Sequence, residues 1–363
     1  MRSIDELPTP AILIDLDVVE RNIARMSDRA RAAGVRLRPH AKTHKIIEIA
    51  RVQIAAGASG LTLAKIGEAE VFADAGFDDL FLAYPTVGGD RARRLLALAD
   101  RLRISVGADS VEGARSLSEV FRAAHRTLDV LLKIDCGFHR VGVEPESALE
   151  TARAIAGLPG LRLSGIFTHA GQAYHSDTPE AVAAVGRLEG ETVAALAREM
   201  RSAGLAIEEV SVGSTPTAAH AMGIPGVTEC RPGNYVYHDA SQVALGTCSE
   251  KDCAMTVAAT VVSVPAADRA VVDAGSKTLS SDVLRPRPGG YGIVVGTRSR
   301  IDRLSEEHGI VKAEPGDRFR VGQRVRILPN HACVVSNLHD RVHGIRAGAV
   351  EAPWRVAARG RVD

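Results

Sequence analysis

Aromatic residues are scarce in this chain of 363 residues, at 4% of the sequence, so its core has to be built mainly from Ala, Val, Leu and Ile. The five cysteines are an odd number, and they form no CxxC pair. Free thiols in a reducing, cytoplasmic compartment are therefore expected, and a disulfide framework is not. Long apolar runs and the apolar segment of a secretory signal are also missing, so we expect no spanning helix and no membrane partner.

An excess of one charge is absent as well. The formal net charge is +1, which gives no electrostatic basis for binding nucleic acid. The sequence has no GxSxG elbow, no Walker loop, and no GxGxxG after its first predicted strand. At 45% hydrophobic and 25% charged residues, the composition is that of an ordinary globular protein.

Short strands alternate with amphipathic helices over the first two thirds of the chain. The helices are exemplified by residues 18–33 and 181–203, where apolar residues recur at helical spacing. The eight predicted strands are 11–15, 35–38, 60–63, 80–83, 103–106, 130–135, 163–168 and 209–212. This alternation predicts an α/β fold, a (β/α)8 TIM-type barrel with a parallel core, over residues 9–245. A doubly wound open sheet is the alternative.

The pattern changes near residue 246, where helical periodicity nearly vanishes. The strands predicted there are 254–264, 270–273, 291–295 and 323–328, with turn residues between them. They predict a second, mostly antiparallel β-domain over residues 246–363, with which residues 1–8 are expected to associate. A Pro- and Gly-rich run at 285–290 is predicted to be a loop.

A dense group of cationic and imidazole side chains follows the second predicted strand, in the run RPHAKTHK at 38–45. Nearby positive charge lowers the pKa of an amine and makes it nucleophilic. Lys42, just beyond a strand end, has the properties that a Schiff base to pyridoxal 5'-phosphate requires. The alternative is an exposed basic loop.

Polar residues follow three further strands. Arg140 follows the sixth, His169 ends the seventh, and Gly213 follows the eighth. Because active-site groups of a barrel come from the C-terminal ends of its strands, these residues and Lys42 should meet at one rim. Together they favour a functional site over four unrelated surface positions.

Two glycine turns could bind the phosphate of the cofactor. Gly213, Ser214 and Thr215 offer backbone N–H groups and hydroxyls with little side-chain bulk. Gly233 and Asn234 form a second turn that could close over the same phosphate. Ordinary turn chemistry is the alternative explanation.

Arg140 could face the pyridine nitrogen of the cofactor. A guanidinium does not give up its proton, so the ring nitrogen would stay unprotonated and the cofactor would be a weaker electron sink. A metal ion could supply the missing assistance. A surface arginine in a salt bridge is the alternative.

His331 and Cys333 are the candidate metal ligands. On a strand, residues two apart share a face, so this imidazole and thiolate would project together. The pair suits Zn²⁺ and leaves coordination positions open. A buried cysteine beside a hydrogen-bonded histidine is the commoner origin of such a pattern. His40 and His44 would be a rival site only in a helix, which Pro39 disfavours.

These motifs, in this order, resemble the D-serine dehydratase / D-threonine aldolase family of fold-type III pyridoxal phosphate enzymes. The resemblance covers almost the whole chain, and the run PHAKTHK is highly specific. The matching segments are Thr9-Pro10, 38–45, 168–171, 212–216, 231–235, 273–275 and 331–333. It implies an alanine racemase-like barrel, a C-terminal β-domain, a homodimer, and a divalent metal beside the cofactor. It further implies Lys42 as the Schiff-base lysine, Arg140 at the pyridine nitrogen, and His331 and Cys333 as ligands. Zn²⁺ is favoured, with Mn²⁺ or Mg²⁺ as alternatives.

Within this resemblance, two reactions of D-3-hydroxy amino acids compete. The aldolases resemble one another in carrying Asp and His where this chain has Cys333 and Tyr174. Both differences favour dehydration of D-serine or D-threonine to ammonia and a 2-oxo acid. Aldol cleavage of D-threonine to glycine and an aldehyde stays open because His175 is adjacent. Lys42, His169 and Tyr174 are the expected catalytic residues, and His169 and Tyr174 are also expected to contact the cofactor.

Two remoter alternatives are an amino-acid racemase and a non-catalytic protein that binds pyridoxal phosphate. The His-x-Cys pair has no purpose in a racemase. The non-catalytic barrels of this fold consist of the barrel alone, so the β-domain argues against that alternative.

Overall fold

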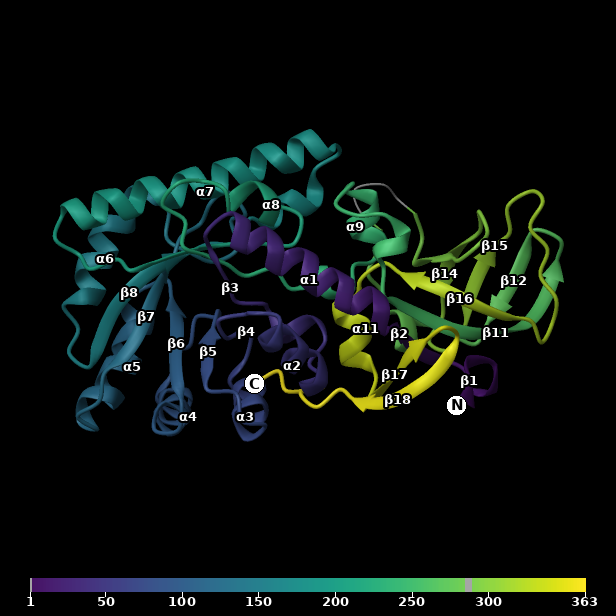
Figure 1. The fold of residues 1–363 in the computed structure, drawn as a ribbon, viewed down its shortest axis with the longest axis horizontal. Coiled ribbons are helices and arrows are strands. Elements are labelled where there is room, and N and C mark those ends of the chain that lie inside the picture. Colours follow the sequence, from purple (N-terminus) through teal and green to yellow (C-terminus); the bar gives the residue numbers. More distant parts are fainter. Residues whose placement is uncertain (1, 285–288) are drawn as a thin grey trace.

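The computed structural model describes residues 2–284 and 289–363, and it places a barrel and a β-domain side by side (Figure 1). The first is an eight-stranded parallel sheet in the order β3-β10-β9-β8-β7-β6-β5-β4, and a bridge from His40 to Thr62 joins its two ends. Its strands are β3 Arg36–Leu37, β4 Leu61–Leu63, β5 Asp79–Leu82, β6 Arg103–Ala108, β7 Leu128–Lys133, β8 Leu161–Phe167, β9 Glu209–Val212 and β10 Glu229–Cys230. The predicted fold class is confirmed.

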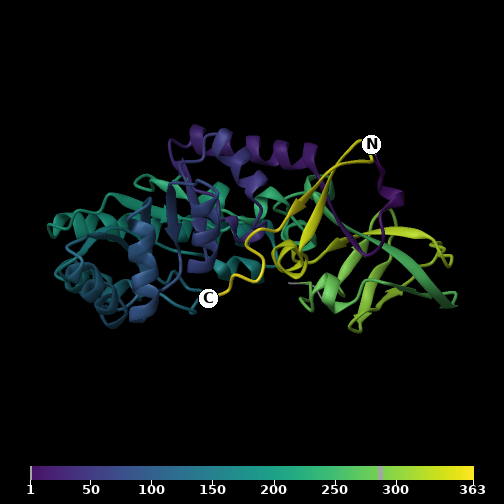
Figure 2. The same ribbon diagram turned by 90° about the horizontal axis from the view of Figure 1, so that it is seen from below.

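Helices cover the outer surface of this sheet, as the two ribbon views show (Figures 1 and 2). They are α1 Leu16–Ala32, α2 Ile47–Ala55, α3 Ile66–Asp74, α4 Gly89–Ala99, α5 Val111–Ala123, α6 Ala148–Ala156, α7 Pro179–Ser202 and α8 Ala218–Ala221. α1 begins where the Asp15 side chain accepts the N–H of Val18, and it ends before Gly34, whose φ is +68°. Among the described residues, no helix combines the length and apolar character that crossing a membrane requires.

The strand expected first in the barrel belongs to the other sheet. β2 (Ala11–Asp15) pairs antiparallel with β11 and parallel with β17, and β10 is the eighth barrel strand instead. Apolar residues of β2 are buried in either location, so their pattern does not select a partner. β10 has two residues, too few to show a strand period.

The second sheet has ten strands, of which β11, β12, β15, β14, β13 and β16 close into an antiparallel barrel through a β11–β16 pairing. β17 and β18 extend it, and β1 (Arg2–Ser3) pairs with β18. The strands are β11 Met255–Ala266, β12 Arg269–Val272, β13 Gly292–Val294, β14 Arg300–Leu304, β15 Gly309–Lys312, β16 Arg324–Pro329, β17 Arg341–Arg346 and β18 Ala349–Arg355. Of the loop predicted at 285–290, residues 285–288 lie outside the described residues.

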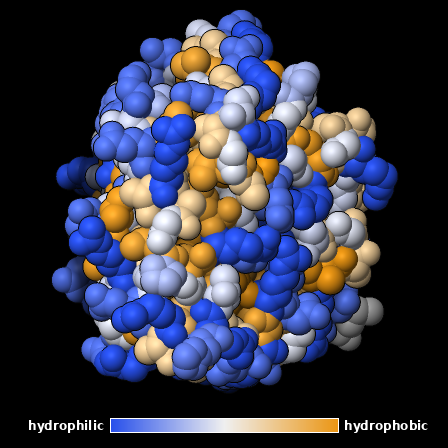
Figure 3. Space-filling model, turned by 90° about the vertical axis from the view of Figure 1, so that its left-hand side faces the viewer, coloured by the Kyte–Doolittle hydropathy of each residue, from blue (hydrophilic) through white to orange (hydrophobic). Residues whose placement is uncertain are grey.

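The parallel barrel is filled at its N-terminal end and in its middle. Buried Arg38 pairs there with Glu229 at 2.8 Å and with Asp79 at 2.5 Å. Further in, the rings of Phe81 and Phe167 meet edge to face with centroids 5.0 Å apart. The outside at this end of the molecule is largely hydrophilic, with hydrophobic residues between the polar ones (Figure 3). The strands' C-terminal rim is therefore where a site can form.

Candidate active site

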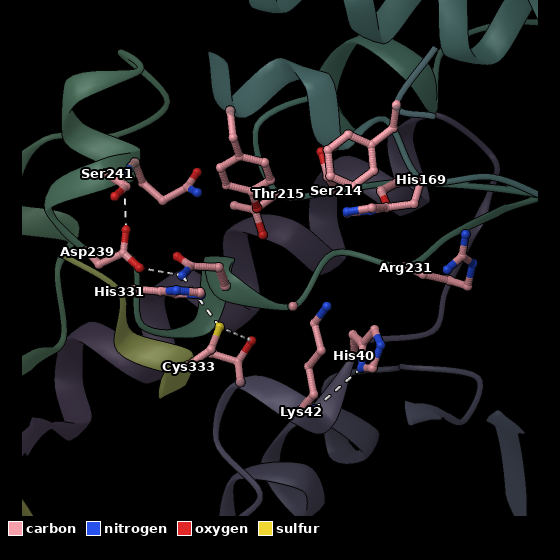
Figure 4. A pocket seen from close by; sticks show the side chains of 18 of the residues that line it. His40, Lys42, His169, Ser214, Thr215, Arg231, Asp239, Ser241, His331 and Cys333 are labelled. Atoms are coloured by element: carbon pink, nitrogen blue, oxygen red, sulfur yellow. Dashed lines mark hydrogen bonds between the residues drawn. The ribbon is translucent and has the colours of Figure 1, made fainter. Parts of the chain in front are cut away.

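A cavity of about 540 Å³ lies at the C-terminal rim of the barrel, against the β-domain (Figure 4). All the residues predicted from the sequence to form the site line this one cavity. These residues are Lys42, Arg140, His169, Tyr174, Gly213, Ser214, Thr215, Gly233, Asn234, His331 and Cys333. The barrel supplies all of them except His331 and Cys333, which come from the β-domain side.

Lys42 lies in a short 3-10 turn, η2 (Ala41–Thr43), that follows β3. The turn begins at His40, whose Nδ1 accepts the N–H of Lys42 at 3.4 Å. Burial lowers the pKa of the Lys42 amine, and the cations of Arg140 and Arg231 lower it further against the opposing effect of Cys333. The side chain thus has the character of a nucleophilic amine.

His40 and His44 do not form the rival metal site. Both ring nitrogens of His44 are engaged, because Nδ1 contacts the Ile46 backbone and Nε2 lies 3.2 Å from Gln53 Oε1. His40 uses Nδ1 to cap the lysine turn. The two imidazoles therefore serve separate hydrogen bonds.

The glycine turn at Gly233 packs against the lysine turn, and the turn at Gly213 is held by Glu189. A Cβ on Gly233 would lie 2.9 Å from both His40 O and Thr43 Oγ1, so only glycine allows this approach. Gly213 has a φ of +129°, and its N–H donates to the buried carboxylate of Glu189 at 3.0 Å. The hydroxyl of Ser214 lies 2.9 Å from Thr217 Oγ1. These turns form a tight polar wall that suits a phosphate.

Arg140 is carried by a loop that one carboxylate fixes. Asp135 Oδ1 accepts the N–H groups of Gly137, Phe138 and His139. The guanidinium of Arg140 then lies 4.7 Å from the centroid of the Phe138 ring. Asp135, His139 and Glu144 are the only cluster of three potential ligands among the described residues, and Asp135 already serves this turn.

Two buried basic side chains, Arg231 and Lys133, also line the cavity, and the sequence analysis assigned no role to either. Arg231, at 4% exposure, donates from Nε to Ser211 Oγ at 2.7 Å. Lys133 places Nζ 4.8 Å from the Phe167 centroid, and burial, followed by the charges of Arg231 and Arg140, lowers its pKa to about 7. Lys133 ends a strand, and that position was the available signal.

His169 and Tyr174 form the upper wall. His169 Nδ1 lies 3.2 Å from the Gly213 carbonyl, so it carries the proton and leaves Nε2 free. Burial, followed by the charge of Lys42, holds the pKa of His169 well below its usual value. Tyr174 lies in η4 (Gly171–His175), where burial raises the pKa of its phenol. His169 is therefore neutral and Tyr174 protonated near neutral pH.

The metal-ligand candidates are not on a strand. β16 ends at Pro329, and His331 is the N-cap of helix α11 (Ala332–Leu338), whose first turn contains Cys333. Asn330 is anchored by Nδ2 donation to the Gly290 carbonyl at 2.7 Å, and the chain turns there. The prediction that His331 and Cys333 share one face of a strand is therefore wrong. Both side chains nevertheless line the same cavity.

Each candidate ligand is held by a neighbour. His331 Nδ1 lies 2.6 Å from Asp282 Oδ2, and the imidazole also interacts with the Cys333 side chain. Although burial opposes it, the charges of Cys333 and Asp282 raise the pKa of His331 to about 11. Cys333 Sγ lies 3.2 Å from Thr43 Oγ1. Burial would raise the pKa of this thiol, but the combined effects of His331, Thr43 and Lys42 lower it. The arrangement favours a thiolate.

Asn234 and Asp239 connect the second glycine turn to α11. Asn234 Nδ2 donates to Asp239 Oδ2 at 2.6 Å, and the same oxygen accepts the N–H of Ala332 at 3.0 Å. Within the described part of the chain, Asn234 Oδ1 and both amide atoms of Gln242 are buried without a hydrogen-bond partner. Buried polar atoms of this kind fit a cavity that receives a polar ligand.

Comparison with known proteins identifies the family. A model described as "Alanine racemase, N-terminal domain" matches residues 14–241, and one described as "Putative serine dehydratase domain" matches residues 254–345. The D-threo-3-hydroxyaspartate dehydratase of Delftia sp. (strain HT23) is 39% identical over 96% of this chain and 97% of its own. The D-threonine aldolase of Arthrobacter sp. is 33% identical over 97% and 93%. The D-serine dehydratase of Dictyostelium discoideum is 31% identical over 94% of each chain.

Solved structures agree. The Delftia enzyme superimposes with a TM-score of 0.92 over 98% of this chain and 99% of its own, at 38% identity. A histidine-to-alanine variant and a cysteine-to-alanine variant "in the metal-free form", both named D-threo-3-hydroxyaspartate dehydratase, are also solved, and the two mutated positions are two residues apart. The chain therefore belongs to the D-serine dehydratase / D-threonine aldolase family, pyridoxal phosphate-dependent lyases with an alanine racemase-like fold.

Proposed function

We propose that Lys42 binds the aldehyde of pyridoxal phosphate at the barrel rim. Bound to an amino acid, this cofactor withdraws electrons from Cα. Its phosphate is assigned to Gly213, Ser214 and Thr215 with Gly233 and Asn234, and its pyridine nitrogen to Arg140. The buried amine and the close-packed glycine turn at Gly233 support this assignment. His169 and Tyr174 complete the wall.

We also propose that His331 and Cys333 hold a divalent metal, with Zn²⁺ favoured and Mn²⁺ or Mg²⁺ as alternatives. An imidazole and a thiolate are donors that Zn²⁺ prefers, and only two protein ligands leave positions open. The Nδ1 contact of His331 with Asp282 leaves Nε2 for the ion. The solved variants of D-threo-3-hydroxyaspartate dehydratase change a histidine and a cysteine that have the same spacing. Such an ion polarises a substrate hydroxyl.

The reaction that we favour is dehydration of a D-3-hydroxy amino acid, D-serine or D-threonine, to ammonia and a 2-oxo acid. The lowered pKa of Lys42 increases the unprotonated share of its amine, and in that form Nζ can accept the Cα proton. The observation that carries this choice is Tyr174: burial keeps its phenol protonated, so it does not serve as the base that aldol cleavage needs. As a protonated phenol it can donate a hydrogen bond to the departing oxygen.

Product analysis tests this choice. The purified enzyme is given D-serine, D-threonine and D-phenylserine in turn, with the L-enantiomers as controls. We expect ammonia and the 2-oxo acid in equal amounts from the D-substrates. Glycine and an aldehyde as the main products of D-threonine would overturn the dehydratase assignment and leave the cofactor and fold in place.

Aldol cleavage is the second candidate. His175 lines the same cavity beside Tyr174 and is an imidazole that could take the proton of a β-hydroxyl. We expect Cys333→Asp to raise the ratio of glycine to 2-oxo acid, because a carboxylate is the ligand that the aldolases carry. An unchanged ratio in this variant would argue against ligand control of the reaction.

We further propose a cytoplasmic homodimer. The free thiol of Cys333 has to stay reduced to bind a metal, which suits a reducing compartment. Tyr84, Val87 and Val141, which are 48%, 51% and 39% exposed, follow strand ends at the barrel rim and offer apolar contact area near the cavity. Sedimentation analysis tests this assembly, and a monomer at micromolar concentration would refute it.

A further inference from the structure

Thr43 lies between the two functional centres. It follows Lys42 directly in η2, its side chain is fully buried, and its Oγ1 is 3.2 Å from Cys333 Sγ. These two residues are separated by 290 positions in the chain. One hydroxyl thus connects the turn that carries Lys42 with the first turn of α11.

The connection is part of a packed group rather than an isolated contact. Gly233 lies so close to Thr43 that a Cβ there would be 2.9 Å from the hydroxyl oxygen. Asn234 Nδ2 is 3.8 Å from Cys333 Sγ and is itself held by Asp239. Asp239 in turn accepts the N–H of Ala332, between the two ligand positions. The lysine turn, the second glycine turn and α11 are therefore in mutual contact.

The Thr43 hydroxyl can act as a hydrogen-bond donor to a metal-bound thiolate. A metal-bound cysteine is a thiolate and can only accept hydrogen bonds, so Thr43 would have to donate its O–H to sulfur. Groups that hydrogen-bond to metal ligands orient them, and their loss typically weakens metal binding about 10- to 100-fold. A valine at this position has the same shape and offers no donor.

Resting on the proposed assignments of Lys42 and Cys333, we propose that Thr43 is a positioning residue that couples metal binding to cofactor binding. An occupied metal site fixes Cys333, Cys333 fixes the Thr43 side chain, and Thr43 fixes the turn that presents Lys42. Coupling between two sites is reciprocal, so bound cofactor should tighten metal binding by the same factor by which metal tightens cofactor binding.

The test compares Thr43→Val with Thr43→Ser, which keeps the hydroxyl. Metal affinity is measured by competition with a chromophoric chelator, with and without cofactor, and cofactor affinity by fluorescence titration, with and without Zn²⁺. We expect Thr43→Val to weaken Zn²⁺ binding at least about tenfold and to abolish the coupling. Thr43→Ser should stay close to wild type. The thiolate-to-metal absorption band of the Co²⁺-loaded protein should shift only in Thr43→Val.

Thr62→Val is the matched control. Thr62 is also fully buried, and its hydroxyl donates to the Arg38 carbonyl at 2.9 Å rather than to a sulfur atom. This variant should lose stability without losing metal affinity. Wild-type Zn²⁺ affinity in Thr43→Val, equal weakening in Thr43→Ser, or equal weakening in Thr62→Val would overturn the proposal. Unchanged Zn²⁺ binding in Cys333→Ala would show that the metal site itself is wrongly assigned. That result would overturn both the proposed metal site and the proposed role of Thr43.

Discussion

At the scale of single residues, Lys42 lines the cavity beside Arg140 and Cys333, and its pKa is lowered by burial. Lys45 is paired with Glu68 at 3.1 Å, and Lys65 lies over the Tyr84 ring. We expect Lys42→Ala to lose the visible absorbance of lysine-bound cofactor and to reduce turnover at least about 10³-fold. Lys65→Ala should retain both. Borohydride reduction followed by peptide mapping checks the assignment, and a label on Lys45 or Lys65 would refute it.

Lys133 should make stability depend on pH. Its pKa is about 7 in the folded protein and 10.5 as the ordinary value, so between these pH values the unfolded chain holds a proton that the folded chain lacks. Stability therefore rises with pH across this window, by on the order of 3–5 kcal/mol in full. Below about pH 7 both states are protonated and the contribution is constant.

The measurement is urea unfolding of wild type and Lys133→Met at several pH values. The difference in unfolding free energy between the two proteins should change with pH only above neutrality, and the variant should lose the rise. A pH-independent difference would show that Lys133 is not a buried neutral amine.

At the scale of elements, the sequence predicted those parts whose pattern is local. Strand–helix alternation located β3 to β9, and the strand ends located Lys42, Arg140 and His169. Pairing partners are not local, which is why β2 was assigned to the barrel and β10 was missed. His331 and Cys333 were identified by residue type, but Asp282 and Thr43, which hold them, have no sequence signal because the contacts are 49 and 290 positions away.

Helix α11 should respond to metal removal. Its N-cap and first turn contain both proposed ligands, whereas its later residue Asn337 is tied to Lys45 Nζ at 2.8 Å. We expect chelation to accelerate amide exchange severalfold in the first turn of α11 and to leave α7 unchanged. Hydrogen exchange with peptide resolution checks this. An equal increase in both helices would indicate general destabilisation instead.

At the scale of the whole molecule, the barrel and the β-domain contribute different chemistry to one cavity. The residues assigned to the cofactor lie on five loops of the barrel, and the proposed metal ligands follow β16 of the other sheet. In the proposed assignment the cofactor is also joined to Lys42 by a covalent bond, which does not depend on the metal. Chelation should therefore remove nearly all turnover while most of the cofactor stays bound. Absorbance after gel filtration in EDTA reports retention, and added Zn²⁺ or Mn²⁺ should restore activity. Full activity in metal-free enzyme would refute a catalytic role for the metal and would leave the β-domain with only a structural role in this cavity.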